Sequence, residues 1–419
     1  LMDNPRPKIT LCMIVKDENH CIERCLESCY PYIDRYDITD TGSTDGTQDI
    51  IKKFFDEKGI PGEVHQSDWK GFGDHAGKMG SRTESLHNAE KSDAEYAWVI
   101  DADDSIAGDF HWPEVMDSHS YSLKIHRGDF TWWRNQVFKL RMGWKYAGIL
   151  HEYAHCNAPE GEQITSMRID GDYHVEARTE GNRNVDIDPI EKYSRDAELL
   201  EKALEDEPDN HRYWFYLGQS YFDSQQWSKS SVAYQKRADL GGWEEEAFYA
   251  LFRVAICSSL LNEPIDVQAH KYMAAYDYRP IRAEPLHQIA RMYRMNNMPR
   301  AAYLYAKQAA SLPYPHGDIL FLADEVYKWQ ALDELGATAF YCHDFEVGFH
   351  VMEKLVSERH YPESEHTRML ENHRQYSLKV QELHKQREEQ RQAEVEAQKQ
   401  KKNKEVRKKN SYKKRKGKN

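Results

Sequence analysis

The chain has 419 residues, of which 40% are hydrophobic and 12% aromatic, enough for two or three domains with sizeable cores. Its net charge is −13, but residues 399–419 carry twelve Lys or Arg against one Glu, so the rest of the chain carries −24. This acidity excludes broad binding of a polyanion by the body of the protein, although the basic tail could contact one.

The sequence contains no pattern typical of export or membrane insertion. Residues 1–8 lack a charged region followed by an apolar stretch, so we expect no signal peptide, and no run of about 18 apolar residues predicts a transmembrane segment. The seven cysteines form no C-x-x-C pair and no Cys/His zinc spacing, which favours small buried residues in a reducing compartment. We therefore expect a cytoplasmic protein.

The first 60 residues alternate between strand and helix patterns. Apolar runs predict buried strands at 9–15 and 37–40, and helical patterns follow at 20–29 and 48–55. This alternation predicts an α/β fold with a parallel sheet. Neither G-x-G-x-x-G nor G-x-x-x-x-G-K-S/T is present, which argues against a dehydrogenase and a P-loop enzyme.

Glycines are dense in the segment 69–82, with four of them within ten residues. This density predicts a mobile loop close to phosphate. Arg82 stands at the end of the segment, where it could be an arginine at the exposed start of a helix.

Three carboxylates, Asp101, Asp103 and Asp104, follow an apolar strand pattern at 96–100. They repel one another and are costly to bury unless a cation lies among them. A hard divalent ion such as Mg²⁺ or Mn²⁺ prefers these oxygen ligands. Because ligands of open α/β sheets bind beyond the carboxyl ends of strands, the pattern predicts a metal–phosphate site, with a simple acidic turn as the alternative.

Residues 11–18, 40–47 and 101–104, in this order and spacing, resemble the family 2 glycosyltransferases of GT-A fold. The resemblance implies a mixed central sheet flanked by helices, a nucleotide-sugar donor with UDP as the expected nucleotide, and Mn²⁺ or Mg²⁺ as the cofactor. Arg82 matches a family arginine that lines the donor site, although Thr83 stands where Asn is usual. The positions implied for the donor are Val15, Glu18, Asp40, Arg82, Asp101 and Ala102, and those implied for the metal are Asp103 and Asp101.

The resemblance also implies a role for each acid. Glu18 and Asp40 match positions that hold the ribose and the base, and Asp101 and Asp103 match the pair that meets the ribose and the metal–diphosphate. The residues themselves leave alternatives open, because Asp40 could cap a turn and Glu18 could be a solvated acid at a helix start.

Two further groups of residues supply candidates for catalysis. His151 and Glu152 form a His-Glu pair like one found in family members that carry helical repeats, and Asp172 and His174 form a later cluster. Family 2 enzymes mostly invert the anomeric centre, which requires a base that takes the proton of the acceptor hydroxyl. We expect Glu152 to be this base, with Asp172 second. His151 and His174 are candidate metal or phosphate ligands, and either could be structural instead.

From about 188 to 378 the pattern becomes helical with an internal repeat. Two sets of residues share the spacing of a tetratricopeptide first helix, Trp214, Leu217, Gly218 and Tyr221, and Leu286, Ile289, Ala290 and Tyr293. We predict four or so stacked helix pairs, with a generic helical domain as the alternative. Such a solenoid could hold a glycan or protein acceptor, or form a homodimer.

These patterns divide the chain into three predicted parts. Residues 1–185 form the GT-A domain, 186–378 the all-α repeat domain, and 379–419 a charged, lysine-rich tail that we expect to be disordered. The tail could contact a polyanion.

The sequence therefore predicts a metal-dependent glycosyltransferase, of the hexosyl- or N-acetylhexosaminyl-transferase class, that uses a UDP-sugar and an unidentified acceptor hydroxyl. One alternative is a repeat scaffold with an inactive transferase domain. Another is a sugar nucleotidyltransferase, which should carry a glycine-rich loop after its first strand; residues 16–19 contain no glycine.

Overall fold

A computed structural model of the chain describes residues 6–128, 130–157, 163–181 and 188–416. It divides into two compact units, residues 1–233 and 234–419. The first unit contains a sheet with its helices, followed by α4 (Pro189–Asp206) and α5 (His211–Asp223). The first helical pair therefore belongs to the same compact unit as the sheet.

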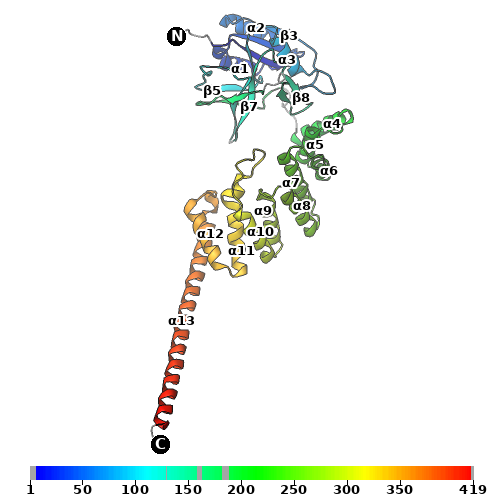
Figure 1. Cartoon of the computed structure of the whole chain (residues 1–419). Coiled ribbons are helices and arrows are strands. Elements are labelled where there is room, and N and C mark those ends of the chain that lie inside the picture. The colour runs from blue at the N-terminus through cyan, green and yellow to red at the C-terminus, as the bar shows by residue number, and fades with distance from the viewer. Residues whose placement is uncertain (1–5, 129, 158–162, 182–187, 417–419) are drawn as a thin grey trace. The chain divides into compact units, whose positions relative to one another are not determined.

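The main sheet of the first unit lies near the N-terminus in Figure 1. Its strand order is β3-β2-β1-β4-β7-β6-β11-β5, with β10 beside β6. β2, β1 and β4 run parallel, whereas β7 is antiparallel to both β4 and β6. The predicted mixed central sheet is confirmed. In chain order its strands are β1 (Ile9–Val15), β2 (Arg35–Asp40), β3 (Gly62–Gln66), β4 (Tyr96–Val99), β5 (Ser105–Gly108), β6 (Ser120–Arg127), β7 (Phe130–Lys139), β10 (Ser166–Arg168) and β11 (Tyr173–Glu176).

Helices cover both faces of the sheet. α1 (Ile22–Cys29) and α2 (Thr47–Lys58) pack on one face in the largest core, and α3 (Ser81–Ala89) packs on the other. The regular spacing of Cys25 and Cys29 places both on the buried side of α1, and all seven cysteines of the chain are free. The cysteines thus serve as small core residues here.

The glycine-rich loop before α3 packs against a small second sheet. This sheet pairs β8 (Lys145–Ala147) with β9 (Tyr153–His155). A Cβ on Gly73 would lie 2.5 Å from the carbonyl oxygen of Gly148, and one on Gly80 would lie 2.3 Å from the carbonyl carbon of Gly73. The glycine density that predicts mobility therefore has a packing reason at these two positions, because only glycine allows backbones so close.

The second unit is built from consecutive helices, most of them joined by short connections, so that sequence neighbours pack as pairs; a longer connection, residues 312–325, follows α10. Its α9 and α10 bury Leu286 and Ala290 together with Ala306 and Ala309, small residues that permit close approach. The predicted helical repeat architecture is confirmed. The helices are α6 (Trp227–Asp239), which begins in the first unit, α7 (Glu244–Leu260), α8 (Ile265–Tyr278), α9 (Glu284–Met295), α10 (Pro299–Ser311), α11 (Ala331–Ala339), α12 (Phe345–Glu358) and α13 (His366–Lys416).

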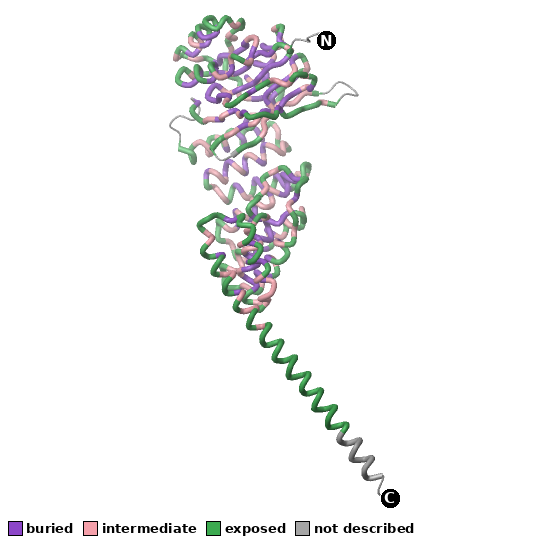
Figure 2. The backbone as a smooth tube through the Cα atoms, turned by 90° about the vertical axis from the view of Figure 1, so that its left-hand side faces the viewer, coloured by how far each residue is buried: buried purple, intermediate pink, exposed green. Residues whose placement is uncertain are grey.

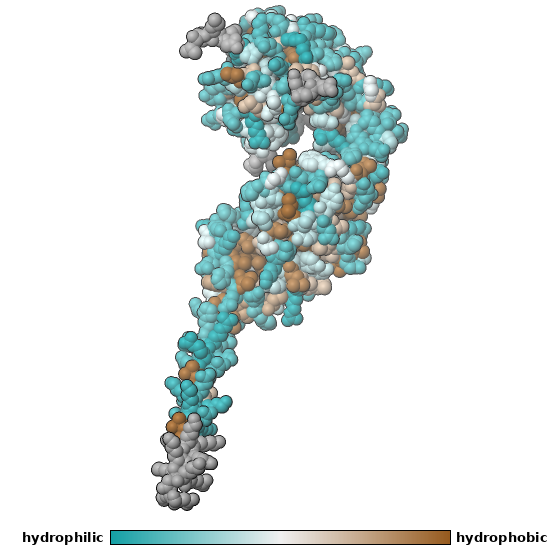
Figure 3. All heavy atoms as spheres, viewed as in Figure 1, coloured by the Kyte–Doolittle hydropathy of each residue, from teal (hydrophilic) through white to brown (hydrophobic). Residues whose placement is uncertain are grey.

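The last helix, α13, continues through the segment for which the sequence predicts disorder. Its first turns are packed, since Met369 and Tyr376 are buried and the Tyr376 hydroxyl donates to the Gly336 carbonyl at 2.6 Å. From 384 to 406 every residue is exposed and most are hydrophilic (Figures 2 and 3). The helix persists because residues 366–416 contain no Gly or Pro and are rich in Lys, Glu, Gln and Arg, which favour helix.

Among the helices within the described ranges, none is both long and apolar enough to cross a bilayer.

Candidate active site

Acidic side chains from three neighbouring strands meet at one edge of the main sheet. β2, β1 and β4 lie side by side, and Val15 at the end of β1 is in register with Asp40 at the end of β2. β4 ends at Val99, and Asp101 and Asp103 follow directly. Because the carboxyl ends of parallel strands share an edge, the three stretches that carry the family resemblance converge on one site.

The turns that follow β1 and β2 are tied to each other by hydrogen bonds. The Asp17 N–H donates to Ser43 Oγ at 2.9 Å, and the Glu18 N–H donates to Thr47 Oγ1 at 2.8 Å. In return the Thr44 N–H donates to Asp17 Oδ1 at 2.7 Å, and Asp17 adopts a left-handed φ of 56°. The contacts of Ser43, Thr44 and Thr47 therefore hold the turn that carries Glu18 next to Asp40, at the carboxyl edge of the sheet.

Asp40 is fully buried, and only one of its two carboxylate oxygens has hydrogen-bond partners among the described residues. Its Oδ1 accepts hydrogen bonds from the Gly42 and Ser43 N–H groups and from Gln48 Nε2, each at 2.9 Å. Its Oδ2 is buried and accepts none from any described residue. Asp40 thus caps the turn, as one interpretation expects, and also presents an unsatisfied acceptor, which is costly unless a ligand donates to it.

Arg82 joins two of the predicted site residues. Its Nη2 lies 2.7 Å from Asp101 Oδ1 and its Nε lies 2.6 Å from Glu152 Oε1. The guanidinium lies 5.8 Å from the rings of both Phe72 and Tyr146. Burial acts to lower the pKa of Arg82, but attraction by Asp101 and Glu152 outweighs it and raises the pKa above its usual value. Arg82 is therefore a charged group inside the site and not an exposed arginine.

A second arginine, Arg134 of β7, places a positive charge beside Asp101 and Asp104. Its guanidinium lies 3.0 Å from Asp104 Oδ2 and 3.6 Å from Asp101 Oδ2. Burial acts to raise the pKa of Asp101, but Arg82 and Arg134 outweigh it and lower the pKa to about 2. Burial, together with repulsion by Asp101, raises the pKa of Asp104 to about 6 despite Arg134.

Asp101 and Asp104 each form an ion pair with an arginine, whereas Asp103 forms none with any described residue. It is 9% exposed, and its Oδ2 accepts a hydrogen bond from the Gly181 N–H at 2.9 Å. Burial is the main cause that raises the pKa of Asp103, and repulsion by Asp101 adds to it. No Lys, Arg or His of the described chain forms an ion pair with Asp103. An uncompensated buried carboxylate beside a second one is an environment that a bound divalent cation would satisfy, so the donor set fits a metal.

Glycine at 181 keeps space open beside these acids. A Cβ there would lie 3.2 Å from Asp103 Oδ2 and 3.6 Å from Glu18 Oε1, so both carboxylates face the same point. The preceding residues bring the chain back to this edge, since the Arg178 N–H donates to Asp104 Oδ1 at 3.1 Å. The carboxylates of β1 and β4 are thus covered by a segment that follows β11.

Residues of α5 contact the loop that carries His151 and Glu152. The Arg212 guanidinium donates to the His151 carbonyl at 2.7 and 3.1 Å, and the His151 ring stacks on Tyr216 with centroids 3.9 Å apart. Tyr213 also contacts the loop, with its hydroxyl 3.3 Å from the Ile149 N–H. The helical pair therefore fixes the loop that carries Glu152, and the His151 ring is engaged with Tyr216.

The structure does not bring Asp172 and His174 to the acid cluster. On the antiparallel β5–β11 pair, Glu176 is opposite Ser105, next to Asp104, whereas Tyr173 is opposite Gly108. Asp172 is exposed at the far end of this pair. His174 lies 3.2 Å from Glu176 Oε2 and close to His126. The sequence grouped these residues by proximity along the chain, but the direction of β11 separates them from Asp103.

Sequence reasoning gave no site role to Arg134, Arg178 or Gly181, although Arg134 begins an Arg-x-x-x-Phe-Lys stretch similar to one in family members that carry helical repeats. Arg134 and Arg178 are charged residues beside otherwise apolar strand patterns, which is a weak signal for a buried ion pair. Gly181 had no signal at all, because its role depends on a contact 78 residues away in the chain.

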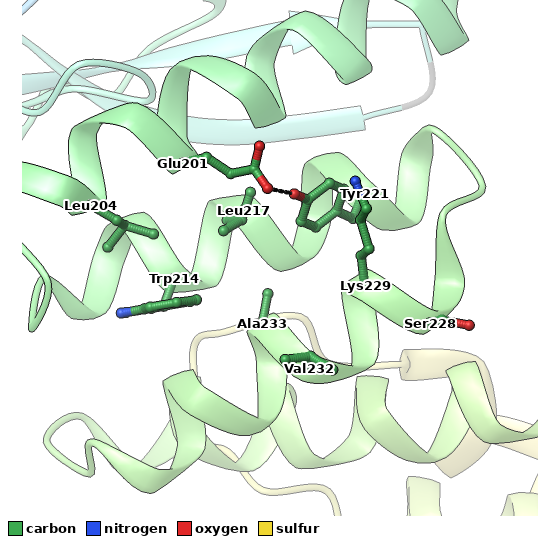
Figure 4. Close-up of a pocket in the computed structure, with 9 residues that line it drawn as sticks. All are labelled: Glu201, Leu204, Trp214, Leu217, Tyr221, Ser228, Lys229, Val232 and Ala233. Carbon is green, nitrogen blue, oxygen red and sulfur yellow. Dashed lines mark hydrogen bonds between the residues drawn. The ribbon is translucent and has the colours of Figure 1, made fainter.

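The described residues of the first unit line a small polar cavity and a larger apolar groove. One, of about 230 Å³, is lined by the glycine-rich loop, the residues flanking Glu152, and α4–α5, including Asp74, Gly148, Tyr153 and Arg212. The other, of about 490 Å³, is an apolar groove along α4, α5 and α6, in which Glu201 is hydrogen-bonded to Tyr221 (Figure 4). The apolar groove lacks the grouped carboxylates of the sheet edge and does not suit a metal–diphosphate.

The carboxylates at the carboxyl edge of this mixed sheet lie where open α/β sheets bind ligands. Residues 10–156 match the family described as glycosyl transferase family 2. The predicted resemblance to this family is therefore confirmed over this range, which lies in the first unit. A search of curated proteins returns no significant match.

Solved structures similar to parts of the chain include several helical proteins. A MamA structure of AMB-1 is 26% identical over 30% of this chain and 70% of that chain, with a TM-score of 0.25. MamA residues 41-end from Desulfovibrio magneticus RS-1 are 12% identical over 40% and 86%, with a TM-score of 0.31. YrrB, described as a TPR protein with an unusual peptide-binding site, is 13% identical over 43% and 84%, also with a TM-score of 0.31.

Proposed function

We propose that this chain transfers a sugar from a nucleotide-sugar donor to an acceptor hydroxyl, with UDP as the nucleotide and inversion at the anomeric carbon. The observation that carries the proposal is the convergence of Asp40, Arg82, Asp101 and Asp103 at the carboxyl edge of the sheet. The transferred sugar would be a hexose or an N-acetylhexosamine.

The nucleoside is assigned to the β1–β2 side of the site. The unsatisfied Oδ2 of Asp40 would accept a ring N–H of the base, and Glu18 would accept a ribose hydroxyl. Val15 and Ala102 are buried beside these acids and would contact the nucleotide through their backbones. The hydrogen bond to Asp40 Oδ2 would satisfy an acceptor that is otherwise costly to bury.

Mn²⁺ or Mg²⁺ is assigned to Asp103 together with Asp101. Bound there, the ion would neutralise the charge that grows on the diphosphate as the sugar departs. Arg82 would hold the diphosphate from the opposite side, because its guanidinium is already fixed between two carboxylates. His151 remains a candidate ligand of the metal or phosphate, and its ring would first have to leave Tyr216.

Glu152 is assigned as the base. Its Oε1 accepts from Arg82, and no described residue donates to its Oε2, which could therefore take the proton of the acceptor hydroxyl. The acceptor oxygen then bonds to the anomeric carbon while the bond to the diphosphate breaks, and the diphosphate leaves with the negative charge. Asp172 is the second candidate, but its position on β11 argues for Glu152.

The acceptor would be a glycan or a protein side chain, presented near the small cavity that flanks Glu152. The helical repeats offer a surface for a protein acceptor or for a homodimer. The lysines of α13 at 399–404 are exposed and could contact a polyanion.

The proposal is tested by screening nucleotide sugars for metal-dependent release of nucleotide, with UDP and Mn²⁺ binding followed by calorimetry. Asp103→Asn should abolish both turnover and the metal dependence of UDP binding. Asp109→Asn is the matched control, since Asp109 is exposed and pairs only with His111 outside the site. A wild-type chain that shows no metal-dependent binding of any nucleotide would instead support the inactive-scaffold alternative.

A further inference from the structure

A second group of metal-ligating side chains lies on the sheet away from the acid cluster. It consists of His126 on β6 and His174 and Glu176 on β11, which are parallel neighbours with Glu176 in register with His126. His174 and Glu176 are two residues apart on one strand, so both point to the same face. The intervening Val175 and the neighbouring Ile125 are buried in the core on the other face.

Two of the three distances between the donor atoms match those around a tetrahedral ion. His126 Nδ1 and His174 Nε2 each lie 3.2 Å from Glu176 Oε2, and all three donor atoms lie within 4.8 Å of one another. Bonds of about 2.0–2.1 Å to a tetrahedral Zn²⁺ separate neighbouring ligand atoms by roughly 3.3 Å. The donor atoms would therefore need to move little to bind such an ion.

The three side chains are also reachable and rigidly mounted. Their exposed fractions are 37% for His126, 35% for His174 and 29% for Glu176, which leaves one side of the group open to solvent. All three come from paired strands, which position side chains better than loops do. Two imidazoles and one carboxylate suit borderline metals such as Zn²⁺, Co²⁺ or Fe²⁺ better than Mg²⁺.

We propose that His126, His174 and Glu176 bind one divalent transition-metal ion of the Zn²⁺ type, with water in the fourth position. The site is distinct from the donor edge. Arg134, which contacts Asp101 and Asp104, is paired with Leu123, three residues and about 10 Å along β6 from His126. Leu123 is buried in the core, so Arg134 and His126 point to opposite faces of the sheet.

The ion would act as a clamp between β6 and β11. The chain continues from Glu176 to Arg178 and Gly181, which hydrogen-bond Asp104 and Asp103. Fixing the end of β11 would therefore fix the segment that covers the acids. The alternative for the same group is a simple His–Glu ion pair: a hydrogen bond from His126 is the largest cause of the lowered pKa of Glu176, so the carboxylate is charged in either case.

The test is Zn²⁺ and Co²⁺ binding to the full chain after treatment with a chelator, measured by calorimetry and by the visible spectrum of Co²⁺. The wild type should bind one equivalent of Zn²⁺, and His174→Gln, His126→Gln and Glu176→Gln should each weaken this binding at least tenfold. Zn²⁺ should raise the melting temperature of the wild type but not of these three variants. Asp103→Asn should still bind this equivalent of Zn²⁺. That result would distinguish the His126, His174 and Glu176 site from the proposed Mn²⁺ or Mg²⁺ site at Asp101 and Asp103.

The control variant is His111→Gln. His111 forms a His–carboxylate pair with Asp109 at 2.9 Å but has no third ligand within the described chain. Its substitution should leave the Zn²⁺ equivalent unchanged. Equal Zn²⁺ affinity in the wild type and in all three site variants, or loss of binding in His111→Gln, would overturn the proposal. Circular dichroism of each variant confirms that loss of binding is not loss of fold, and Glu176→Gln keeps the size and hydrogen-bonding capacity of the side chain.

Discussion

Replacing Arg82 should have two separable effects, one on stability and one on donor binding. Arg82→Met removes a guanidinium that pairs with Asp101 and Glu152 at 2.7 and 2.6 Å. Breaking a buried ion pair by removing one partner typically costs about 3–5 kcal/mol. The Asp101 side chain is 35% exposed and keeps Arg134, so the lower end of this range, about 3 kcal/mol, is expected.

The effect on the donor follows from the same contact. A hydrogen bond to a charged group contributes about 1.5–3 kcal/mol, so loss of the contact between Arg82 and the diphosphate should weaken UDP binding by roughly 10- to 100-fold. Calorimetry measures the UDP affinity, and amide hydrogen exchange in β1 and β4 measures the stability of the first unit alone.

Two further variants sharpen this experiment. Arg195→Met is the control, because Arg195 forms an exposed pair with Glu191 on α4 and its loss should cost less than about 0.5 kcal/mol. Glu152→Gln added to Arg82→Met should recover part of the stability, since it removes the Glu152 charge that the loss of Arg82 leaves unpaired, whereas Asp101 keeps Arg134. An Arg82→Met chain as stable as the Arg195→Met chain would refute the inferred role of these ion pairs.

Two other predictions concern catalysis and pH. Glu152→Gln should slow sugar transfer by about 100-fold or more while leaving UDP affinity unchanged, because the base acts only on the acceptor proton; an unchanged rate measured with saturating donor would exclude Glu152 as the base. His287 is 6% exposed, and burial lowers its pKa below 6.5. Its unfolded form therefore binds a proton that the folded form resists, so the second unit should lose stability as pH falls below about 6.5. In His287→Gln this loss should be smaller, as measured by hydrogen exchange in α9 at pH 7.5 and 5.5, and an identical pH dependence in both chains would contradict the assignment.

Much of the first unit follows from local patterns. The strands at 9–15 and 96–99, the helix after residue 47 and the buried face of α1 were predictable because their hydrophobic periodicity matches the element that forms. The same holds for the repeat helices, where the spacing of Leu286, Ala290 and their neighbours marks the packed face. The tail was predicted less well, because charge suggested disorder whereas helix propensity and the absence of Gly and Pro support α13.

The sequence by itself determined which residues could bind a nucleotide and where each strand would present them. The meeting of Asp40 with Asp101 and Asp103 was predictable, since parallel strands share one carboxyl edge. Only the tertiary structure decided that Arg82 bridges Asp101 and Glu152, that Gly181 caps Asp103, and that His174 joins His126 instead of the acids. These contacts join residues 19 to 78 positions apart, and strand order and direction, which no local pattern encodes, bring them together.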